Sequence, residues 1–528
     1  MKKILFLFLT LCSSMGMVYG DITWSAPTAI STPLTNASNP VVVVDSNNNI
    51  TAAWVENNVI KSSSFPSGGS WSAPVALSNI SNTASNPTLA LDSTGNVTAL
   101  WVENAMIESA TFPVGGSWSA ETSPISGSGA SNPVLAVDSS GNAVGVWVRS
   151  GYIESSTRIS GTWSLVSVLS TINASNPDVA ISDVGIAMAV WHGLSVSGAD
   201  IIVSDILTIS SNTWASALNV FNITPSFFHN YPKVVLDVFG NANVAWWRFN
   251  HLDDDNYQNV QVVSSALPNG SPAWTLQPAF LSNFGNRNPA DLSIQLGCDS
   301  NGDVLAVWTN SYDGQTFSLE SDRVLFGGSW ESSVQPQSPS LYTFGIDLDI
   351  VGGTALLASM AWDGVSNVTI QTQEQAVGDP ILQSWSDPNQ MSTNPDNAYP
   401  QCGISLTGST VNAVIVWTYY NGTNVVINAS TGSDTALSPP TGVSATQSLT
   451  DFGVFQDYYN TITWGASSEP HVIQYNIFRD GVFFGAVDPF TFAFQDHNQI
   501  EGGTVTYGVA ALISGFRQTD IVSYTLFP

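Results

Sequence analysis

The sequence predicts an all-β protein, most of which is a β-propeller. Three observations support this prediction. A unit marked by tryptophans repeats along most of the chain, and each unit holds four short strand-like segments. The start of the array also supplies a strand that its last unit lacks. Because a different β pattern follows, we expect a second, smaller domain at the C-terminus.

Two series of tryptophans mark the repeat and include 16 of the 18 tryptophans in the chain. One series opens each unit: Trp24, Trp71, Trp118, Trp163, Trp214, Trp274, Trp330 and Trp385. The other lies in mid-unit: Trp54, Trp101, Trp147, Trp191, Trp246, Trp308, Trp362 and Trp417. The spacing of the opening residues is 47 at the first step and 60 at the longest, a drift that loop insertions explain.

The unit that begins at Trp71 shows the strand pattern most clearly. Its apolar segments are 88–91, 97–102 and 106–112, and Trp118 opens the fourth. Residues 92–96 form a predicted hairpin turn in which Gly95 supplies a positive φ. Some strands are apolar on both faces, as in Val41 to Val44, which a sheet stacked between two other sheets requires.

The two ends of the array predict a closed ring. Residues 24–31 resemble a lone fourth strand, whereas the last unit has three strands, near 402–406, 411–417 and 425–428. If these pair, they complete one blade and leave no sheet edge exposed. We favour eight four-stranded blades; seven stays possible because the last two units are degenerate.

The chain divides into four predicted parts. Residues 1–20 have the charged start, short apolar stretch and small-residue exit of a signal peptide, so we expect export to the medium or the cell surface. Residues 21–431 form the propeller, 432–440 a polar linker that ends in Pro439-Pro440, and 441–528 the second domain.

The C-terminal segment resembles a fibronectin type III domain. The matching features are the Pro-Pro start, Trp464 on the second strand, Tyr475 and Asp480-Gly481 on the third strand and its turn, and Tyr507 at the corner position. The resemblance implies an immunoglobulin-like sandwich of seven strands. Most modules of this family are spacers or binding modules.

Some turns before the opening tryptophans resemble a degenerate Asp-box. Ser64, Gly68 and Trp71 have the spacing of S-x-D-x-G-x-x-W, but Pro66 stands in place of the aspartate. The resemblance to secreted, sialidase-like propellers concerns architecture. A sialidase would need an arginine triad and a Tyr/Glu pair, and no matching motif surrounds the propeller's arginines, so the sequence favours a non-enzymatic protein.

The composition excludes several partners. Forty acidic residues against eleven basic ones give a net charge of −29, which repels nucleic acid and anionic membranes. No long apolar run follows the signal peptide, so membrane insertion is not expected, and we expect a monomer without cofactors. Cys298 and Cys402 fall on first strands two blades apart, which predicts buried free thiols.

Two recurring motifs have structural explanations with a functional alternative. Asp92, Asp138, Asp237 and Asp299 each precede a glycine by three residues, which predicts self-capped hairpin turns; calcium binding there stays open. An Asn-Pro pair precedes many first strands, at Asn39, Asn86, Asn132, Asn176 and Asn288. Proline suits a strand start, but these residues would also ring the central channel, so a role in binding stays open.

Two classes of function remain. The first is a non-catalytic secreted or cell-surface binding or adhesion protein that uses the propeller rim to contact an extracellular protein or glycan. The alternative is a carbohydrate-directed protein, either a lectin or a glycoside hydrolase of sialidase-like fold. The repeat positions of the tryptophans favour core packing over ligand contact.

The fifth unit supplies the candidate binding residues, because its loops are longer and more polar than those of the first units. They are His229, Arg248, His251, Asp253, Asp254, Asp255 and Tyr257. Histidine and carboxylate groups could also hold a cation there. We expect alanine at the three aspartates to weaken partner binding while leaving melting nearly unchanged.

Overall fold

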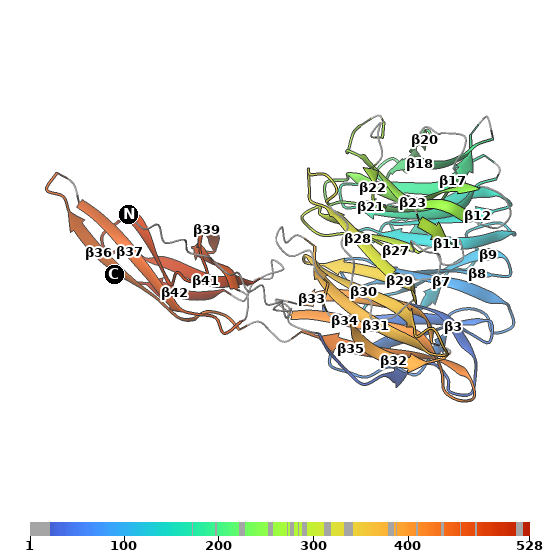
Figure 1. Cartoon of the computed structure of the whole chain (residues 1–528), viewed down its shortest axis with the longest axis horizontal. Helices are drawn as coiled ribbons and strands as arrows, with labels where there is room; N and C mark the ends of the chain where they lie inside the picture. The colour runs from blue at the N-terminus through green and yellow to red at the C-terminus, as the bar shows by residue number, and fades with distance from the viewer. Residues whose placement is uncertain are drawn as a thin grey trace, which may run out of the picture.

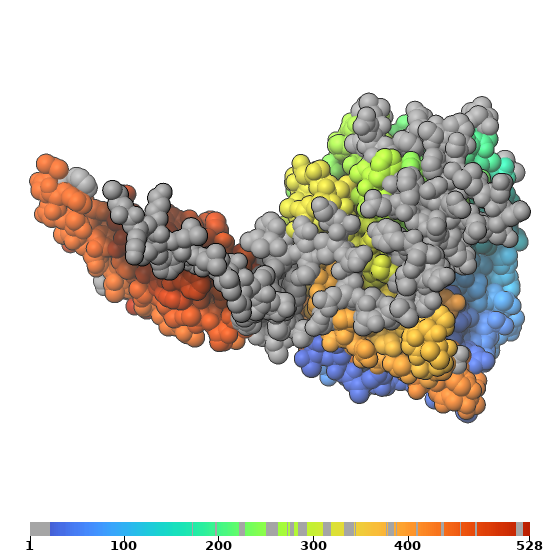
Figure 2. Space-filling view, viewed as in Figure 1, coloured from blue at the N-terminus to red at the C-terminus, as the bar shows by residue number. Residues whose placement is uncertain are grey.

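A computed structural model describes residues 22–171, 173–195, 198–220, 228–251, 257–271, 273–274, 279–282, 285–287, 293–310, 318–331, 342–377, 385–386, 388–395, 397–407, 410–434, 438–454, 456–469, 472–513 and 521–527. These residues are all-β and lie in two bodies, a broad one coloured blue to orange and a narrow red-orange one (Figures 1 and 2). The described residues include no helix that could cross a membrane. The predicted signal peptide lies outside them.

The broad body contains eight sheets among the described residues, each with three long antiparallel strands. The first strands are β3 (Ala37–Val44), β7 (Ala84–Leu91), β11 (Ala130–Val137), β16 (Ser175–Ser182), β21 (Phe228–Leu236), β26 (Ile294–Cys298), β29 (Tyr342–Val351) and β33 (Ala398–Thr407). The second strands are β4 (Ile50–Glu56), β8 (Val97–Glu103), β12 (Ala143–Arg149), β17 (Ile186–Leu194), β22 (Ala242–His251), β27 (Val304–Asn310), β30 (Thr354–Trp362) and β34 (Thr410–Tyr420).

The third and outer strands complete these sheets. The third strands are β5 (Val59–Phe65), β9 (Met106–Phe112), β13 (Tyr152–Ile159), β18 (Asp200–Thr208), β23 (Tyr257–Leu267), β28 (Ser318–Val324), β31 (Val368–Ala376) and β35 (Val425–Ser433). The outer strands are β1 (Thr23–Trp24), β2 (Thr28–Ala29), β6 (Val75–Ala76), β10 (Ser119–Ala120), β14 (Thr162–Trp163), β15 (Ser167–Val168), β19 (Thr213–Trp214), β20 (Leu218–Asn219), β24 (Ala279–Phe280), β25 (Gly285–Arg287) and β32 (Asn389–Asn394).

Apolar cores between neighbouring sheets join them into a ring. Each first strand contacts the next one along the chain, and β33 contacts β3. Each pair of neighbouring sheets shares one cluster of buried apolar side chains, including the pair formed by the last and first sheets. Sheets that are covered on both faces need apolar residues on both, which explains the run from Val41 to Val44.

The N-terminal strands complete the last sheet, as the sequence predicts. Thr23 and Trp24 of β1 pair with Ser433 and Gly432 of β35, and β2 pairs further along the same strand. Ile22 and Ile30 are buried beside them, each in a different inter-sheet core. The first and last parts of the broad body are therefore held together by backbone hydrogen bonds and by apolar contacts.

A β-bulge interrupts most of the first strands, and this corrects one sequence prediction. The Asn-Pro pairs do not precede the strands but lie within them: in β7, Ser85 pairs with Val102 and Thr88 with Leu100, so Asn86 and Pro87 together oppose Trp101. The same shift occurs in β3, β11, β16, β21, β29 and β33. The strands start earlier than expected because a bulge can accommodate both a positive φ and a proline without a donor.

The mid-unit tryptophans are core residues with one exception. Trp54, Trp147, Trp246, Trp308 and Trp417 are fully buried. In the seventh sheet, however, Ser359 opposes the bulge, and Trp362 lies three residues further along β30, where it is only partly buried. Trp362 is therefore not equivalent to the others, although its position in the sequence suggested that it was.

The aspartate turns have the geometry that the sequence predicts. In the first, Asp45 Oδ1 accepts hydrogen bonds from the amides of Asn47 and Asn49 at 2.9 and 2.8 Å, and Asp45 Oδ2 accepts one from Asn49 Nδ2 at 2.8 Å. The turns at Asp92, Asp138 and Asp237 repeat this arrangement, and the turn at Asp299 closely follows it. Each carboxylate thus closes its own hairpin.

The narrow body consists of two facing sheets among the described residues. One has the order β36 (Thr441–Asp451), β37 (Gln456–Gly465), β40 (Ala493–Gln499). The other has the order β39 (Val482–Val487), β38 (Val472–Arg479), β41 (Val505–Ile513), β42 (Val522–Leu526). Trp464, Tyr475 and Tyr507 lie in their shared core.

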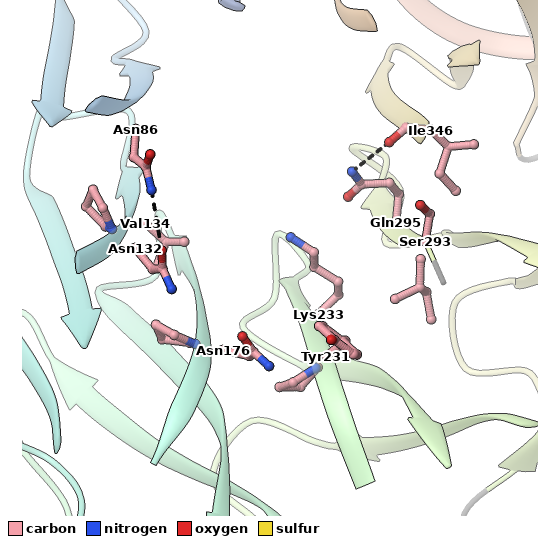
Figure 3. Close-up of a pocket in the computed structure, with 13 residues that line it drawn as sticks. Asn86, Asn132, Val134, Asn176, Tyr231, Lys233, Ser293, Gln295 and Ile346 are labelled. Carbon is pink, nitrogen blue, oxygen red and sulfur yellow. Dashed lines mark hydrogen bonds between the residues drawn. The ribbon is translucent and has the colours of Figure 1, made fainter. Parts of the chain in front are cut away.

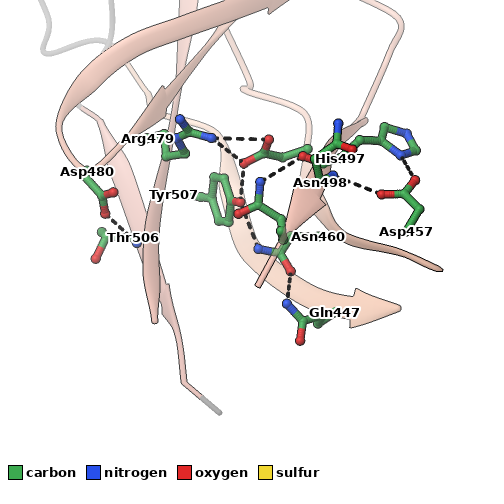
Figure 4. A network of polar contacts seen from close by, with 11 residues as sticks. Gln447, Asp457, Asn460, Arg479, Asp480, His497, Asn498, Thr506 and Tyr507 are labelled. Atoms are coloured by element: carbon green, nitrogen blue, oxygen red, sulfur yellow. Dashed lines mark hydrogen bonds and ion pairs between the residues drawn. The ribbon is translucent and has the colours of Figure 1, made fainter. Parts of the chain in front are cut away.

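The hydroxyl of Tyr507 is buried in a polar network inside this core (Figure 4). It donates a hydrogen bond to Asp496 Oδ2 at 2.6 Å and accepts one from Asn460 Nδ2 at 2.9 Å. Arg479 also contacts Asp496, at 3.2 Å. Burial, and then the bond to Asp496, raise the pKa of Tyr507, so the hydroxyl stays protonated and continues to donate.

Ring closure by the N-terminal strands can be tested by deletion. Removing residues 21–31 should expose the edge of β35 and leave gaps where Ile22 and Ile30 fill two inter-sheet cores, causing aggregation or loss of cooperative melting. Size-exclusion chromatography and calorimetry measure both effects. A deletion of residues 438–528 is the control and should leave the melting of the broad body unchanged. A monomeric 21–31 deletion variant with unchanged melting would contradict the closure.

The Tyr507 network provides a second test. Residues 438–528 should fold alone, and Tyr507→Phe in this fragment should lower its free energy of unfolding by about 1 to 3 kcal/mol, because two buried polar groups lose a partner. Urea titration measures the change. Tyr524→Phe, at a partly exposed site on β42, is the control and should have little effect. An unfolded fragment would argue against an independent domain.

Candidate functional site

Polar side chains on the first strands, several of them at or next to a bulge, surround a pocket at the centre of the ring (Figure 3). Its volume is about 430 Å³, and residues of six consecutive sheets line it. The polar residues of the lining include Asn86, Asn132, Asn176, Tyr231, Lys233 and Gln295. Three asparagines of the Asn-Pro motif thus lie around the central channel, as expected, and their role in binding stays a prediction.

Asparagine side chains form one side of the pocket. Asn86 Nδ2 donates to Asn132 Oδ1 at 3.4 Å, and Asn176 Nδ2 donates to Asn230 Oδ1 at 2.7 Å. An amide side chain has two donor hydrogens and an oxygen with two lone pairs, so each retains capacity for a ligand after one such bond. This side of the pocket can therefore both donate and accept hydrogen bonds.

Lys233 provides the cation of the pocket, and its ammonium group extends toward the open centre in Figure 3. Its Nζ lies 3.6 Å from Asp178 Oδ1 on the neighbouring first strand. Asp178 Oδ2 accepts a hydrogen bond from the amide of Val234 at 2.9 Å. Asp178 thus caps an N–H group on the inner edge of β21 and balances the charge of Lys233.

Asp347 has the same role on the opposite side. It occupies the equivalent position of β29, one residue after the bulge, and its Oδ2 accepts a hydrogen bond from the amide of Cys402 at 2.9 Å. Gln295 Nε2, on β26, donates to the carbonyl of Ile346 at 3.1 Å. Burial raises the pKa of Asp347 to about 6, although the Cys402 amide and Lys233 oppose the shift.

The thiols are free, as the sequence predicts. Cys402 is buried, whereas Cys298 is only half-buried, which corrects the expectation for that residue. Burial raises the pKa of Cys298 to about 12, so it stays protonated, and its Sγ donates to the carbonyl of Leu236 at 3.2 Å.

His229, a predicted binding residue, is part of the core. It is 2% exposed, and its Nδ1 accepts a hydrogen bond from Trp246 Nε1 at 2.8 Å. In four other units a glutamate accepts from the equivalent tryptophan, at Trp54, Trp101, Trp147 and Trp308. Burial, followed by the charges of Arg248 and His192, lowers the pKa of His229 to about 4. The neutral ring therefore acts as a structural acceptor.

The other candidates of the fifth unit lie on a longer hairpin than the sequence suggested. Strand β22 continues to His251, which pairs with Tyr257 at the start of β23, so Arg248 and His251 are strand residues. The Arg248 guanidinium lies 4.7 Å from the Phe280 ring centroid, and burial lowers its pKa. Asp253, Asp254 and Asp255 lie outside the described residues, as does Asn288.

Among the residues that the structure describes, no group of three or more histidine, cysteine, aspartate or glutamate side chains is arranged to hold a metal ion. The aspartate turns engage their carboxylates with their own backbone and asparagine side chains, as described above. The cation hypothesis for the fifth-unit loop depends on aspartates outside this part of the chain, so it stays a prediction.

Sequence reasoning missed Lys233, Tyr231 and Gln295 as pocket residues. One signal was present: after residue 3 the chain has only two lysines, Lys61 and Lys233. Tyr231 also stands before a proline where the earlier units have asparagine, but this equivalence emerges only once the bulges align the strands.

No protein-family model and no curated protein matches the chain. Solved structures with a similar all-β arrangement include a protein of unknown function from Dyadobacter fermentans, at 11% identity and a TM-score of 0.40 over 78% of this chain and 99% of that one. An ulvan lyase from a new family of polysaccharide lyases, bound to a saccharide, matches at 9% and 0.42 over 77% and 97%. The lectin of Aleuria aurantia in complex with Fucα1-6GlcNAc matches at 11% and 0.35 over 70% and 98%. No residue role transfers at such values.

The buried His229 predicts a pH effect on stability. Its pKa of about 4 lies below the ordinary 6.5, so between these values the unfolded chain binds more protons. This contribution is fully present above pH 6.5 and is lost as pH falls toward 4. Relative to His229→Gln, which keeps an acceptor but does not titrate, the wild type should lose up to about 3 kcal/mol between pH 7 and 4. Parallel pH profiles in urea titrations would argue against a neutral buried histidine.

Proposed function

We propose that the protein is a non-catalytic carbohydrate-binding protein that takes a neutral saccharide into the central pocket. The observation that carries the proposal is the lining: amide side chains, a tyrosine and a lysine converge on one pocket. Sugar hydroxyls donate and accept hydrogen bonds, and amides do both. A tyrosine ring can cover the apolar face of a sugar ring. Pockets with a few convergent polar groups are the usual place for small ligands.

The charge balance favours a neutral ligand over an acidic one. Asp178 lies 3.6 Å from the ammonium of Lys233, and Asp347 is close enough to Lys233 for the two charges to interact. The chain as a whole carries −29, which repels polyanions at long range. Lys233 is thus better suited to donating hydrogen bonds to hydroxyls than to attracting an anion.

The pocket chemistry favours binding over hydrolysis. Most glycoside hydrolases place two carboxyl groups on either side of the scissile bond. The described residues that line this pocket include no aspartate or glutamate. Asp178 and Asp347 are not among these lining residues, and each caps a backbone amide of the next first strand.

The setting of this site is part of the proposal. We infer an eight-bladed β-propeller, supported by the ring of eight sheets and their shared cores. The order of the two C-terminal sheets and the buried Tyr507 support a fibronectin type III domain as the second body. The signal-like residues 1–20 support export, with the second domain as a spacer or attachment module.

Adhesion to an extracellular protein through the fifth-unit rim is the second candidate. The extended hairpin of β22 and β23, in which His251 pairs with Tyr257, favours it because Asp253, Asp254 and Asp255 follow β22 and precede β23 in the sequence. In this alternative the aspartates make the contact, and the central pocket has no role.

A glycan array that contains neutral and acidic saccharides tests the proposal. We expect binding to neutral glycans without turnover. Lys233→Met and Asn132→Ala should each weaken it about tenfold, because each removes hydrogen bonds to the ligand. Titration calorimetry with a glycan from the array measures the loss.

Two control variants separate the candidates. Lys61→Met removes the other lysine, on β5 of a sheet that contributes no lining residue, and should have no effect. Replacing Asp253, Asp254 and Asp255 with alanine should also leave glycan binding intact. Absence of glycan binding, together with a protein partner lost on changing these aspartates, would favour the adhesion alternative.

A further inference from the structure

One backbone position recurs in the ring and carries different residues. It is the residue that comes first in each bulge, and its φ is positive in every described case. Four units have asparagine there, with φ of 50, 51, 50 and 50° at Asn39, Asn86, Asn132 and Asn176. The seventh unit has Gly345 with φ 56°. The fifth and eighth units have Tyr231 and Tyr399, both with φ 53°.

Tyrosine is a poor choice for this backbone conformation. A positive φ brings Cβ close to the backbone, which glycine avoids and asparagine tolerates, whereas a bulky residue there is an outlier. The bulge keeps the conformation because proline follows the tyrosine and a buried tryptophan opposes the pair in both strands. Backbone strain of this kind persists where the surroundings impose it, and it occurs preferentially at functional sites.

Burial of the rings does not explain the tyrosines. The exposed fractions are 40% for Tyr231 and 58% for Tyr399. Asparagine would fit the same backbone more easily, as four other units show. Folding stability therefore does not account for the aromatic residue at these two positions.

The two tyrosines occupy equivalent bulge positions on the first strands, which form the inner ring of strands. Tyr231 lines the pocket directly. Tyr399 is on β33, which contacts β29, and the bulge of β29 contributes Ile346 to the lining. The first strands β26 and β29 separate the two tyrosines around the ring, so they are on the order of 10 Å or more apart. One sugar ring cannot span that distance.

We propose that Tyr231 and Tyr399 are ligand-contact residues that stack on different rings of one oligosaccharide, and that they are retained despite their backbone strain. The proposal rests on the carbohydrate-binding function proposed above and names its ligand class as a neutral oligosaccharide longer than one ring. Tyr231 contacts the ring inside the pocket, and Tyr399 contacts a ring that extends over the rim.

The test compares stability and binding in the same variants. Tyr231→Asn and Tyr399→Asn in the full chain should leave the melting temperature unchanged or raise it, because asparagine tolerates this φ. Asn39→Tyr is the matched control for stability: it puts a tyrosine at the same bulge position of the first unit and should lower the melting temperature. A lowered melting temperature in both asparagine variants would overturn the proposal, since the tyrosines would then be structural.

Binding is measured by calorimetry with cellohexaose, xylohexaose, mannohexaose and arabinohexaose, each against its monosaccharide. Both asparagine variants should bind a hexasaccharide about tenfold more weakly than the wild type. Tyr399→Asn should not change the affinity for the monosaccharide, whereas Tyr231→Asn should reduce it. Tyr231→Phe and Tyr399→Phe, which keep the ring, should bind as the wild type does.

The outcomes distinguish the two proposals. If Lys233→Met abolishes binding of a hexasaccharide and the asparagine variants bind normally, the pocket function stands and the stacking role is wrong. If the wild type binds none of the eight sugars and no neutral glycan on the array, the carbohydrate function fails, and the stacking role fails with it. Equal loss for monosaccharide and hexasaccharide in Tyr399→Asn would contradict the two-ring arrangement.

Discussion

The packing of a two-residue bulge against a buried tryptophan is the interaction on which the ring depends. In most units the bulge of the first strand opposes the tryptophan in the middle of the second strand. The indole fills the core between neighbouring sheets, and in five units its N–H group donates to a glutamate or to His229. Removing either partner would leave a void or an unpaired buried group. The bulge and its tryptophan therefore recur from unit to unit, although the loop lengths vary.

The same bulge explains why the centre of the ring is polar. A bulge turns a side chain out of the regular alternation. The first strands are also the inner edges of their sheets, so some of their backbone amides have no partner in the ladder. Asp178 and Asp347 cap such amides on the next strand. Asparagine amides and Lys233 then line the space. The hydrogen-bonding pocket is thus lined by side chains on the inner edges of the sheets.

Periodicity in the sequence predicted the architecture but not the site. The tryptophans pack between neighbouring units, so they recur at a regular spacing that the sequence shows. The N-terminal segment was expected to complete the last unit, and β1 does pair with β35. Identifying the pocket residues requires the first strands of the different units to be aligned with one another to within one residue. The extra residue of each bulge was not foreseen, so the strand starts were predicted too late. Trp362 was assigned to the core position opposite the bulge, which Ser359 occupies in the structure. The sequence suggested that His229 was a polar loop residue. Its structural role was missed because the acceptor for the indole N–H of Trp246 comes from the first strand, whereas in other units it is a glutamate on the second or third strand.

Because the ring repeats one structural unit, equivalent positions in different units can be compared directly. This comparison is the basis of the argument about the two tyrosines. In a protein without repeats, a tyrosine at positive φ could reflect a local accident of packing. Here the same bulge, with the same φ and an opposing tryptophan, is occupied by asparagine in four units, so the backbone itself does not require an aromatic residue. The difference between the units must lie in what the side chain meets outside the sheet. At Tyr231 the structure places the central pocket there. Departures from the preferred residue, rather than the repeated residues themselves, are therefore the observation on which the proposed ligand contacts rest.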